Sequence, residues 1–128
     1  MTKKTLIVGS GFMGTSIALA SKSDDICCVE KNSDYLDILK NLNLYKNLYK
    51  DINEVNEDFD LIIICSRQKQ ALDHIFNFSK KFPSAVITDI SSSKEFLIDK
   101  NLPRNFISSH PICGSHKTGP KNAEINLF

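Results

Sequence analysis

The sequence predicts a doubly wound α/β domain with a mostly parallel sheet and helices on both faces. Short apolar runs alternate with helix-like segments from the first residues onward, which is the element order of such folds. The run Leu61-Ile62-Ile63-Ile64 is apolar without alternation, as a parallel strand buried on both faces requires. With 128 residues, 41% of them hydrophobic, the chain can build one core, and we expect a single domain over residues 1–128.

The first half of the chain predicts three strands and two helices. Residues 6–8 form a strand that ends at a glycine, and residues 13–22 supply the small and apolar side chains of a tightly packed helix. Residues 26–30 predict the second strand. Ser33 is the expected N-cap of the next helix, because apolar side chains follow it at helical spacing, at Tyr35, Ile38, Leu39 and Leu42. Residues 44–56 predict a short third strand and a helical turn.

The second half continues the alternation. Residues 60–65 contain the strongest strand of the chain, and residues 68–78 predict a helix with one apolar side. Residues 85–90 predict another strand, which a polar serine loop follows. A short helix over residues 94–100 and a last short strand over residues 106–109 complete the expected domain.

Composition narrows the function classes. The 16 Lys and Arg residues balance 15 Asp and Glu residues, so neither nucleic acid nor an anionic membrane is an expected partner on charge alone. The four cysteines form no CxxC pair and three lie in apolar runs, which indicates reduced thiols in a cytoplasmic protein. No apolar run approaches the roughly 18 residues of a membrane span. The run after the basic N-terminus, residues 6–8, is too short for a signal peptide.

Residues 9–14 spell G-x-G-x-x-G directly after the first expected strand and at the start of the first expected helix. Gly9 permits a tight turn, Gly11 lets the backbone approach a pyrophosphate, and Gly14 lets the helix pack closely on the strand. A helix N-terminus attracts phosphate, so we expect Phe12 and Met13 to join the glycines in holding a dinucleotide. This context predicts a Rossmann-like site; the alternative is a strand–helix turn with a purely structural role.

Glu30 ends the second expected strand, 21 positions after Gly9, where an acidic residue would bind the ribose hydroxyls of adenosine. Its carboxylate would repel a 2′-phosphate, so the sequence favours NAD over NADP as the cofactor. Lys31 and Lys22 argue the other way, because a nearby cation can neutralise that phosphate. The alternative for Glu30 is a solvated charge at the end of a strand.

Three polar segments should meet at the carboxyl ends of the parallel strands, where open α/β sheets bind ligands. They are Ser66-Arg67, Ser91-Ser92-Ser93-Lys94, and a Gly- and Pro-rich stretch that begins at His110-Pro111. Their convergence predicts an active site built on loops.

The third segment resembles the signature of prephenate and arogenate dehydrogenases. The resemblance is carried by His110-Pro111-Ile112-Cys113-Gly114-Ser115 and by Lys117-Thr118-Gly119-Pro120. Thr88-Asp89-Ile90-Ser91-Ser92-Ser93-Lys94 and the final Asn126-Leu127-Phe128 are also similar to segments of that family. With the glycine loop, the resemblance covers essentially the whole chain.

The resemblance implies that the ring hydroxyl of prephenate is oxidised, hydride passes to the nicotinamide, and loss of CO₂ gives 4-hydroxyphenylpyruvate. An imidazole suits removal of the hydroxyl proton at cellular pH, and His110 matches the family's catalytic histidine. Ser92 matches the serine that helps orient the histidine, the substrate and the nicotinamide. Further contacts are expected with the cofactor at Ser66, Arg67 and Ser91, and with the substrate at Ser115, His116 and Lys117.

Simpler alternatives stay open for several of these residues. His110 is otherwise a hydrogen-bonded loop histidine, Ser92 a helix cap and Ser115 a turn residue. His110, Cys113 and His116 have H-x-x-C-x-x-H spacing, but they offer only three local ligands, so we expect no metal.

Two positions depart from the family pattern, and one histidine lies outside it. His116 stands where the family usually carries a glutamate, which changes the charge at the substrate site. Ser66-Arg67 replaces an apolar residue and a proline, and Arg67 either approaches the cofactor or faces solvent. His74 falls within the helix expected over residues 68–78, and we expect it on the surface.

The resemblance also implies a helical domain beyond Phe128 that forms a homodimer and supplies cations for the substrate carboxylates. We therefore expect this chain to be the nucleotide-binding part of a longer enzyme or a truncated product. Two alternatives are another Rossmann dehydrogenase with a different small substrate, and a non-catalytic module that binds NAD(H). The sequence does not distinguish prephenate from arogenate.

Overall fold

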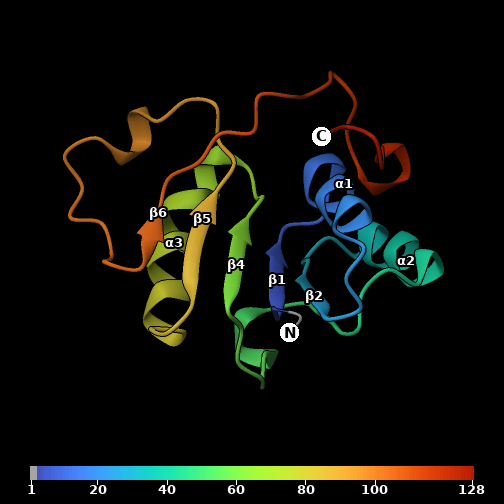
Figure 1. Ribbon diagram of the computed structural model, residues 1–128, viewed down its shortest axis with the longest axis horizontal. Helices are drawn as coiled ribbons and strands as arrows, with labels where there is room; N and C mark the ends of the chain where they lie inside the picture. The colour runs from blue at the N-terminus through green and yellow to red at the C-terminus, as the bar shows by residue number, and fades with distance from the viewer. Residues whose placement is uncertain (1–2) are drawn as a thin grey trace.

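A computed structural model describes residues 3–128, which contain a six-stranded sheet in the order β3-β2-β1-β4-β5-β6. Every pair of neighbouring strands is parallel. The strands are β1 (Thr5–Val8), β2 (Ile26–Val29), β3 (Leu48–Tyr49), β4 (Leu61–Ile64), β5 (Val86–Asp89) and β6 (Phe106–Ile107). The predicted doubly wound α/β fold is confirmed (Figure 1). The strand order reverses between β1 and β4, which is where folds of this kind bind ligands.

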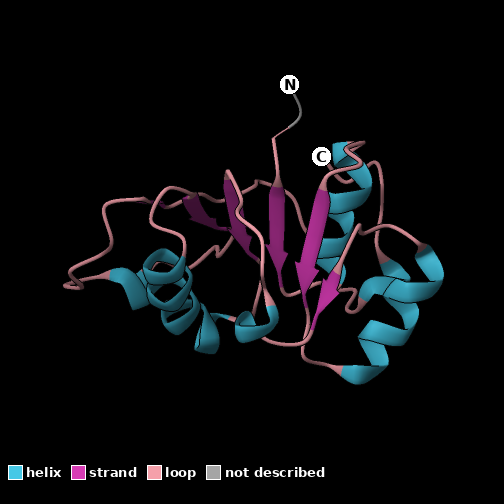
Figure 2. Ribbon diagram, turned by 90° about the horizontal axis from the view of Figure 1, so that it is seen from below, coloured by secondary structure: helices cyan, strands magenta, loops and turns pink. Residues whose placement is uncertain are grey.

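Helices cover both faces of the sheet, and Figure 2 shows the strands between them. The helices are α1 (Phe12–Ser21), α2 (Ser33–Leu42) and α3 (Gln68–Lys81), with short 3₁₀ turns η1 (Ile52–Glu54), η2 (Glu95–Leu97) and η3 (Pro120–Asn122). Alternate residues of the strands feed two separate cores. Leu6 and Val8 pack in the core that contains α3, whereas Ile7 packs in the core that contains α1 and α2.

Three local predictions need correction. The N-cap of α2 is Asn32 rather than Ser33, because the Asn32 side chain accepts hydrogen bonds from the amides of Asp34 and Tyr35 at 3.0 and 3.1 Å. The helix expected over residues 94–100 is only the 3₁₀ turn η2. Helix α3 continues past residue 78 to Lys81. Within the described part of the chain, no helix combines the length and apolar character needed to cross a membrane.

Candidate functional site

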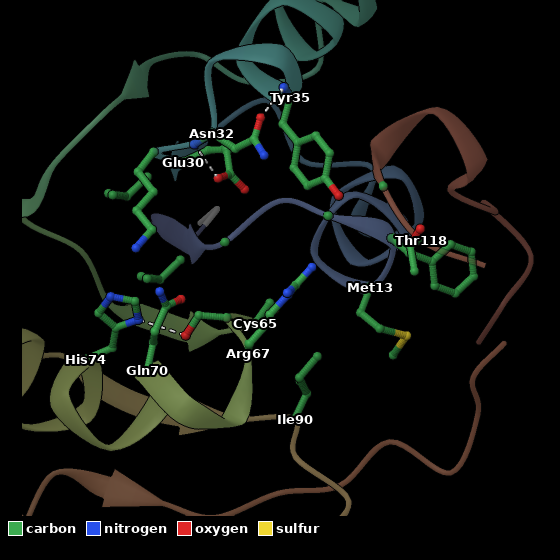
Figure 3. A pocket seen from close by; sticks show the side chains of 18 of the residues that line it. Met13, Glu30, Asn32, Tyr35, Cys65, Arg67, Gln70, His74, Ile90 and Thr118 are labelled. Carbon is green, nitrogen blue, oxygen red and sulfur yellow. Dashed lines mark hydrogen bonds between the residues drawn. The ribbon is translucent and has the colours of Figure 1, made fainter. Parts of the chain in front are cut away.

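A cavity of about 710 Å³ opens at the carboxyl ends of β1, β2 and β4 (Figure 3). Its wall comes from the ends of β1 and β2 with the glycine loop and the turn after β2, from Tyr35, from residues 50–52, from the turn after β4 with four residues of α3, and from Ile90, Ser115 and residues 117–119. The cavity therefore lies at the point where the strand order reverses. That position and volume suit a small organic ligand or a cofactor.

The three glycines of the loop differ in why each must be glycine. Gly9 has a φ of +88°, and a Cβ there would lie 2.9 Å from the Ser66 nitrogen. A Cβ on Gly14 would lie 2.2 Å from the Gly9 carbonyl oxygen. A Cβ on Gly11 would meet only the Tyr35 ring, at 3.7 Å. Close backbone contacts thus explain why positions 9 and 14 are glycine. Gly11 has no such contact, and the space beside it belongs to the cavity.

The N-terminus of α1 faces this cavity without a side-chain cap. Gly11 is the N-cap residue, and no acidic side chain lies in the first turn. Phe12 and Met13, the first residues of the helix, line the cavity. The first-turn N–H groups have no partner within the helix, so they and the helix dipole favour an anion at this spot. These features fit the pyrophosphate of a dinucleotide.

A buried hydroxyl network supports the loop from beneath. The Ser10 hydroxyl lies 2.7 Å from the Thr15 hydroxyl and 2.6 Å from the Tyr45 hydroxyl. Burial is the main cause that raises the pKa of Tyr45 far above its ordinary value, which keeps the phenol protonated. The network ties the loop to α1 and to the segment before β3. Sequence reasoning missed Tyr45, because its position in a mixed polar segment carries no signal for such a contact.

Glu30 is buried at 7% exposure and clamps two turns together. One carboxylate oxygen accepts the Ser10 amide at 2.8 Å, and the other accepts the Asn32 amide at 2.9 Å. The alternative of a solvated strand-end charge is therefore wrong. A carboxylate has about four acceptor positions, so Glu30 can still accept the hydroxyls of a ribose.

The two lysines that could offset the Glu30 charge lie in different places. Lys31 follows Glu30 directly and lines the cavity. Lys22 caps the C-terminus of α1, and a ten-residue helix about 15 Å long separates it from the glycine loop. The expectation that Lys22 helps to neutralise a 2′-phosphate is therefore wrong.

The turn after β4 carries a hydrogen-bonded pair at the cavity. Ser66 Oγ lies 2.7 Å from His74 Nδ1, and the His74 ring packs edge-on against Phe78. Burial, and secondly the Lys31 charge, lower the pKa of His74, while Asp73 opposes them. The expectation of a surface histidine is wrong, because His74 is half-buried and lines the cavity.

Arg67 also lines the cavity, and Figure 3 shows its side chain extending toward the glycine loop. Among the described residues no carboxylate pairs with it. Arg67 thus offers a free guanidinium beside the proposed pyrophosphate position, where it can contact an anion.

The residues expected to act on substrate divide into two groups. Ser115 and Lys117 line the cavity, and Lys117 pairs with Glu124 at 2.6 Å. Ser91, Ser92, His110 and His116 are not part of the cavity wall, and the last three are exposed. Within residues 3–128 no group of three His, Cys, Asp or Glu side chains comes together as a metal site.

Sequence reasoning also missed a role for Asp89, although it lies within one of the quoted segments. This carboxylate at the end of β5 is fully buried and pairs with Lys94 at 2.7 Å. The pairing occupies the charge of Lys94, the last residue of the polar segment that follows β5.

Comparison with known proteins adds an independent view. The model of the family "Prephenate dehydrogenase, nucleotide-binding domain" matches residues 16–128. A prephenate dehydrogenase from Lactococcus lactis subsp. cremoris is 30% identical over 138 residues, which cover 98% of this chain and 38% of that protein. The glycine loop lies before the residues that the family model matches, so its interpretation depends on geometry.

Two solved structures share the fold. The arogenate dehydrogenase of Synechocystis superposes with a TM-score of 0.84 at 25% identity, over 98% of this chain and 46% of that one. A prephenate dehydrogenase from A. aeolicus, in complex with hydroxyphenyl propionate and NAD+, superposes with a TM-score of 0.85 at 23% identity, over 100% of this chain and 48% of that one. The chain therefore spans less than half the length of each of these relatives.

Proposed function

This chain belongs to the family of prephenate dehydrogenase nucleotide-binding domains, and from that premise we propose that it binds NAD+ for the oxidative decarboxylation of prephenate. The family consists of oxidoreductases, and NAD is its cofactor in the A. aeolicus complex. The observation that carries the proposal is the unfilled space beside Gly11, next to the N-terminus of α1, which has no side-chain cap. A turn with a purely structural role needs Gly9 and Gly14 but not Gly11.

The residues of the cavity fit a dinucleotide along its length. Phe12 and Met13 at the start of α1 would hold the pyrophosphate with Arg67, and Glu30 would accept the adenosine ribose hydroxyls. The nicotinamide end would lie toward Ile90, Ser115 and residues 117–119, which complete the wall. When bound, NAD+ supplies the hydride acceptor.

On this chain, His110 would accept the proton of the ring hydroxyl as hydride leaves the ring carbon. Loss of CO₂ from the resulting ketone then gives the aromatic product. Ser92 would orient the imidazole and the substrate, and Ser115, His116 and Lys117 would line the substrate side. Ser66 would contact a ribose of the cofactor, and Ser91 would also contact the cofactor. These roles follow from the family signature and from the position of each loop at the carboxyl ends of the strands.

The charges of the chain bear on how much of the substrate site it contains. Prephenate carries two carboxylates, but Lys94 is paired with Asp89 and Lys117 with Glu124. Of the other cations on the cavity wall, Lys31 and Lys50 lie on the side proposed for the adenosine ribose, and Arg67 lies beside the proposed pyrophosphate position. We infer that cations from outside this chain complete the substrate site, as in a longer enzyme that forms a homodimer. Such an enzyme would act in tyrosine biosynthesis in the cytoplasm.

Arogenate dehydrogenase is the second candidate, because a structure of that activity superposes over nearly the whole chain. The two substrates differ in the side chain opposite the reacting hydroxyl. Both candidates use the same cofactor site and the same proton acceptor, so only turnover separates them.

The test joins residues 1–128 to the remaining part of the Lactococcus relative and follows NADH absorbance with prephenate and with arogenate. We expect NADH formation with prephenate, and loss of most turnover in His110→Asn with NAD+ affinity retained. NADH formation with arogenate alone would favour the second candidate. Near-normal turnover by His110→Asn would remove this histidine from the proposed role.

A further inference from the structure

Ser109, the residue before His110, has every one of its polar groups bonded to the end of β5 or to Lys94. Its amide donates to Asp89 Oδ1 at 3.2 Å, and its carbonyl oxygen accepts from Lys94 Nζ at 2.6 Å. Its hydroxyl donates to the Asp89 carbonyl and accepts from the Thr88 hydroxyl at 2.9 Å. The peptide group that enters His110 is therefore fixed, although His110 itself is exposed.

The same carboxylate also fixes the start of the serine loop. Asp89 Oδ2 accepts the Ser91 amide at 3.2 Å and the Lys94 ammonium at 2.7 Å. Asp89 thus bonds to the residue before Ser92 with one oxygen and to the residue before His110 with the other. Two loops that are about 20 positions apart in the chain meet at one buried charge.

A buried carboxylate of this kind is retained only where partners satisfy it. Asp89 is 0% exposed, and the Lys94 ammonium together with two amides replaces its lost hydration. Neither Ser92 nor His110 lies within a helix or strand, so regular backbone hydrogen bonding does not fix either side chain. The placement of the loops that carry Ser92 and His110 therefore depends on the hydrogen bonds that Asp89 and Lys94 make to Ser91 and Ser109.

We infer that Asp89 and Lys94 are positioning residues that hold Ser92 and His110 in register beside the nicotinamide end of the cavity. The inference rests on the proposed function, which places these two side chains at the reacting atoms. Lys94 acts by joining Asp89 to the Ser109 carbonyl, so a role as a free cation for a substrate carboxylate is the competing explanation.

The test uses residues 1–128 labelled with ¹³C in histidine, which gives three imidazole signals, from His74, His110 and His116. Histidine-to-asparagine variants assign them. In the parent chain, addition of NAD+ should shift the His74 signal at the cavity wall and the His110 signal near the nicotinamide ring.

In Lys94→Met we expect the His110 shift to fall by more than half, while the His74 shift stays and NAD+ affinity changes less than twofold. Lys94→Arg should restore much of the His110 shift, since a guanidinium can still join a carboxylate to a carbonyl. The matched control is Lys80→Met, which removes an exposed lysine on α3 and should leave both signals as in the parent chain.

An equal His110 shift in Lys94→Met and in the parent chain would overturn the inference and leave the proposed function intact. A parent chain in which NAD+ shifts His74 but not His110 would instead contradict the proposed role of His110, and the inference with it. If Lys94→Met fails to fold, the double variant Asp89→Asn with Lys94→Met leaves no unpaired buried charge and is measured in its place. The double variant should likewise lose the His110 shift, and retention of that shift would overturn the inference.

Discussion

Replacing Glu30 by glutamine should reduce the preference of this chain for NAD+ over NADP+ by about tenfold to a hundredfold. The substitution keeps the shape of the side chain and removes its negative charge. In the structure that charge is buried at 7% exposure, at the cavity wall and beside the position proposed for the adenosine ribose. A 2′-phosphate on that ribose would face the carboxylate directly.

The size of the effect follows from the charges and their surroundings. Two like unit charges about 5 Å apart repel by about 3 kcal/mol at an effective dielectric constant of about 20. Lys31 lines the same cavity, and solvent at the cavity mouth screens the pair, so we expect about half of this or somewhat more to survive. A difference of about 1.4 kcal/mol is tenfold in affinity, which sets the lower bound of the expected change.

Calorimetric titration of both cofactors against the parent chain and Glu30→Gln measures this change. Glu30 also bonds to the amides of Ser10 and Asn32, so the variant will lose some affinity for either cofactor. The affinity ratio cancels that loss, because both cofactors need the same loop. Asp34→Asn is the control, since it removes an exposed charge from the first turn of α2. An unchanged ratio in Glu30→Gln, or tighter NADP+ binding by the parent chain, would refute the reasoning.

Three further predictions concern the loop, pH and turnover. Gly11→Val should raise the Kd for NAD+ by about a hundredfold with little change in the free energy of unfolding. Gly14→Ala should lower the free energy of unfolding by about 2–3 kcal/mol, because the alanine Cβ would overlap the Gly9 carbonyl. Titration with NAD+ and urea unfolding measure the two effects. Burial lowers the pKa of His74 below its unfolded value of about 6.5, so the unfolded chain binds more protons and the free energy of unfolding should fall as pH drops through that range. A flat profile in the parent chain, or the same slope in His74→Gln, would contradict this. Residues 1–128 alone should form little NADH from prephenate, and robust turnover would show that no outside cations are needed.

The predictable part of the fold rests on signals that are local in the sequence. The unbroken apolar run of β4 predicts a buried strand, and the glycine motif after β1 predicts a tight strand–helix turn. Neither signal depends on distant residues. Their order along the chain is enough to predict a doubly wound sheet. The site residues of the glycine loop were predictable for the same reason.

The unpredicted contacts depend on which strands become neighbours. Asp89 meets Ser109 only because β5 and β6 lie side by side, and Ser10 meets Tyr45 only because the segment before β3 folds under the loop. Asn32 and Ser33 are both good N-cap residues, and only the backbone conformation decides between them.

His74 is different, because a local signal for its burial does exist. It lies three positions after Ala71 and four before Phe78, both of which are buried on α3. That spacing places all three side chains on one face of the helix. The sequence therefore contained the pattern that turns His74 toward the cavity.

The most direct test of the central claim is a map of NAD+ binding from the backbone amide spectrum of residues 1–128. We predict that the largest shifts fall on the glycine loop and the turns after β2 and β4, at Gly11, Met13, Glu30 and Ser66. Residues near the amino ends of the strands, such as Phe59 before β4 and Ala85 before β5, should show no shift when NAD+ is added. If NAD+ shifts no signal, or if the largest shifts fall at the amino ends of the strands, the assignment of this cavity as the cofactor site is contradicted.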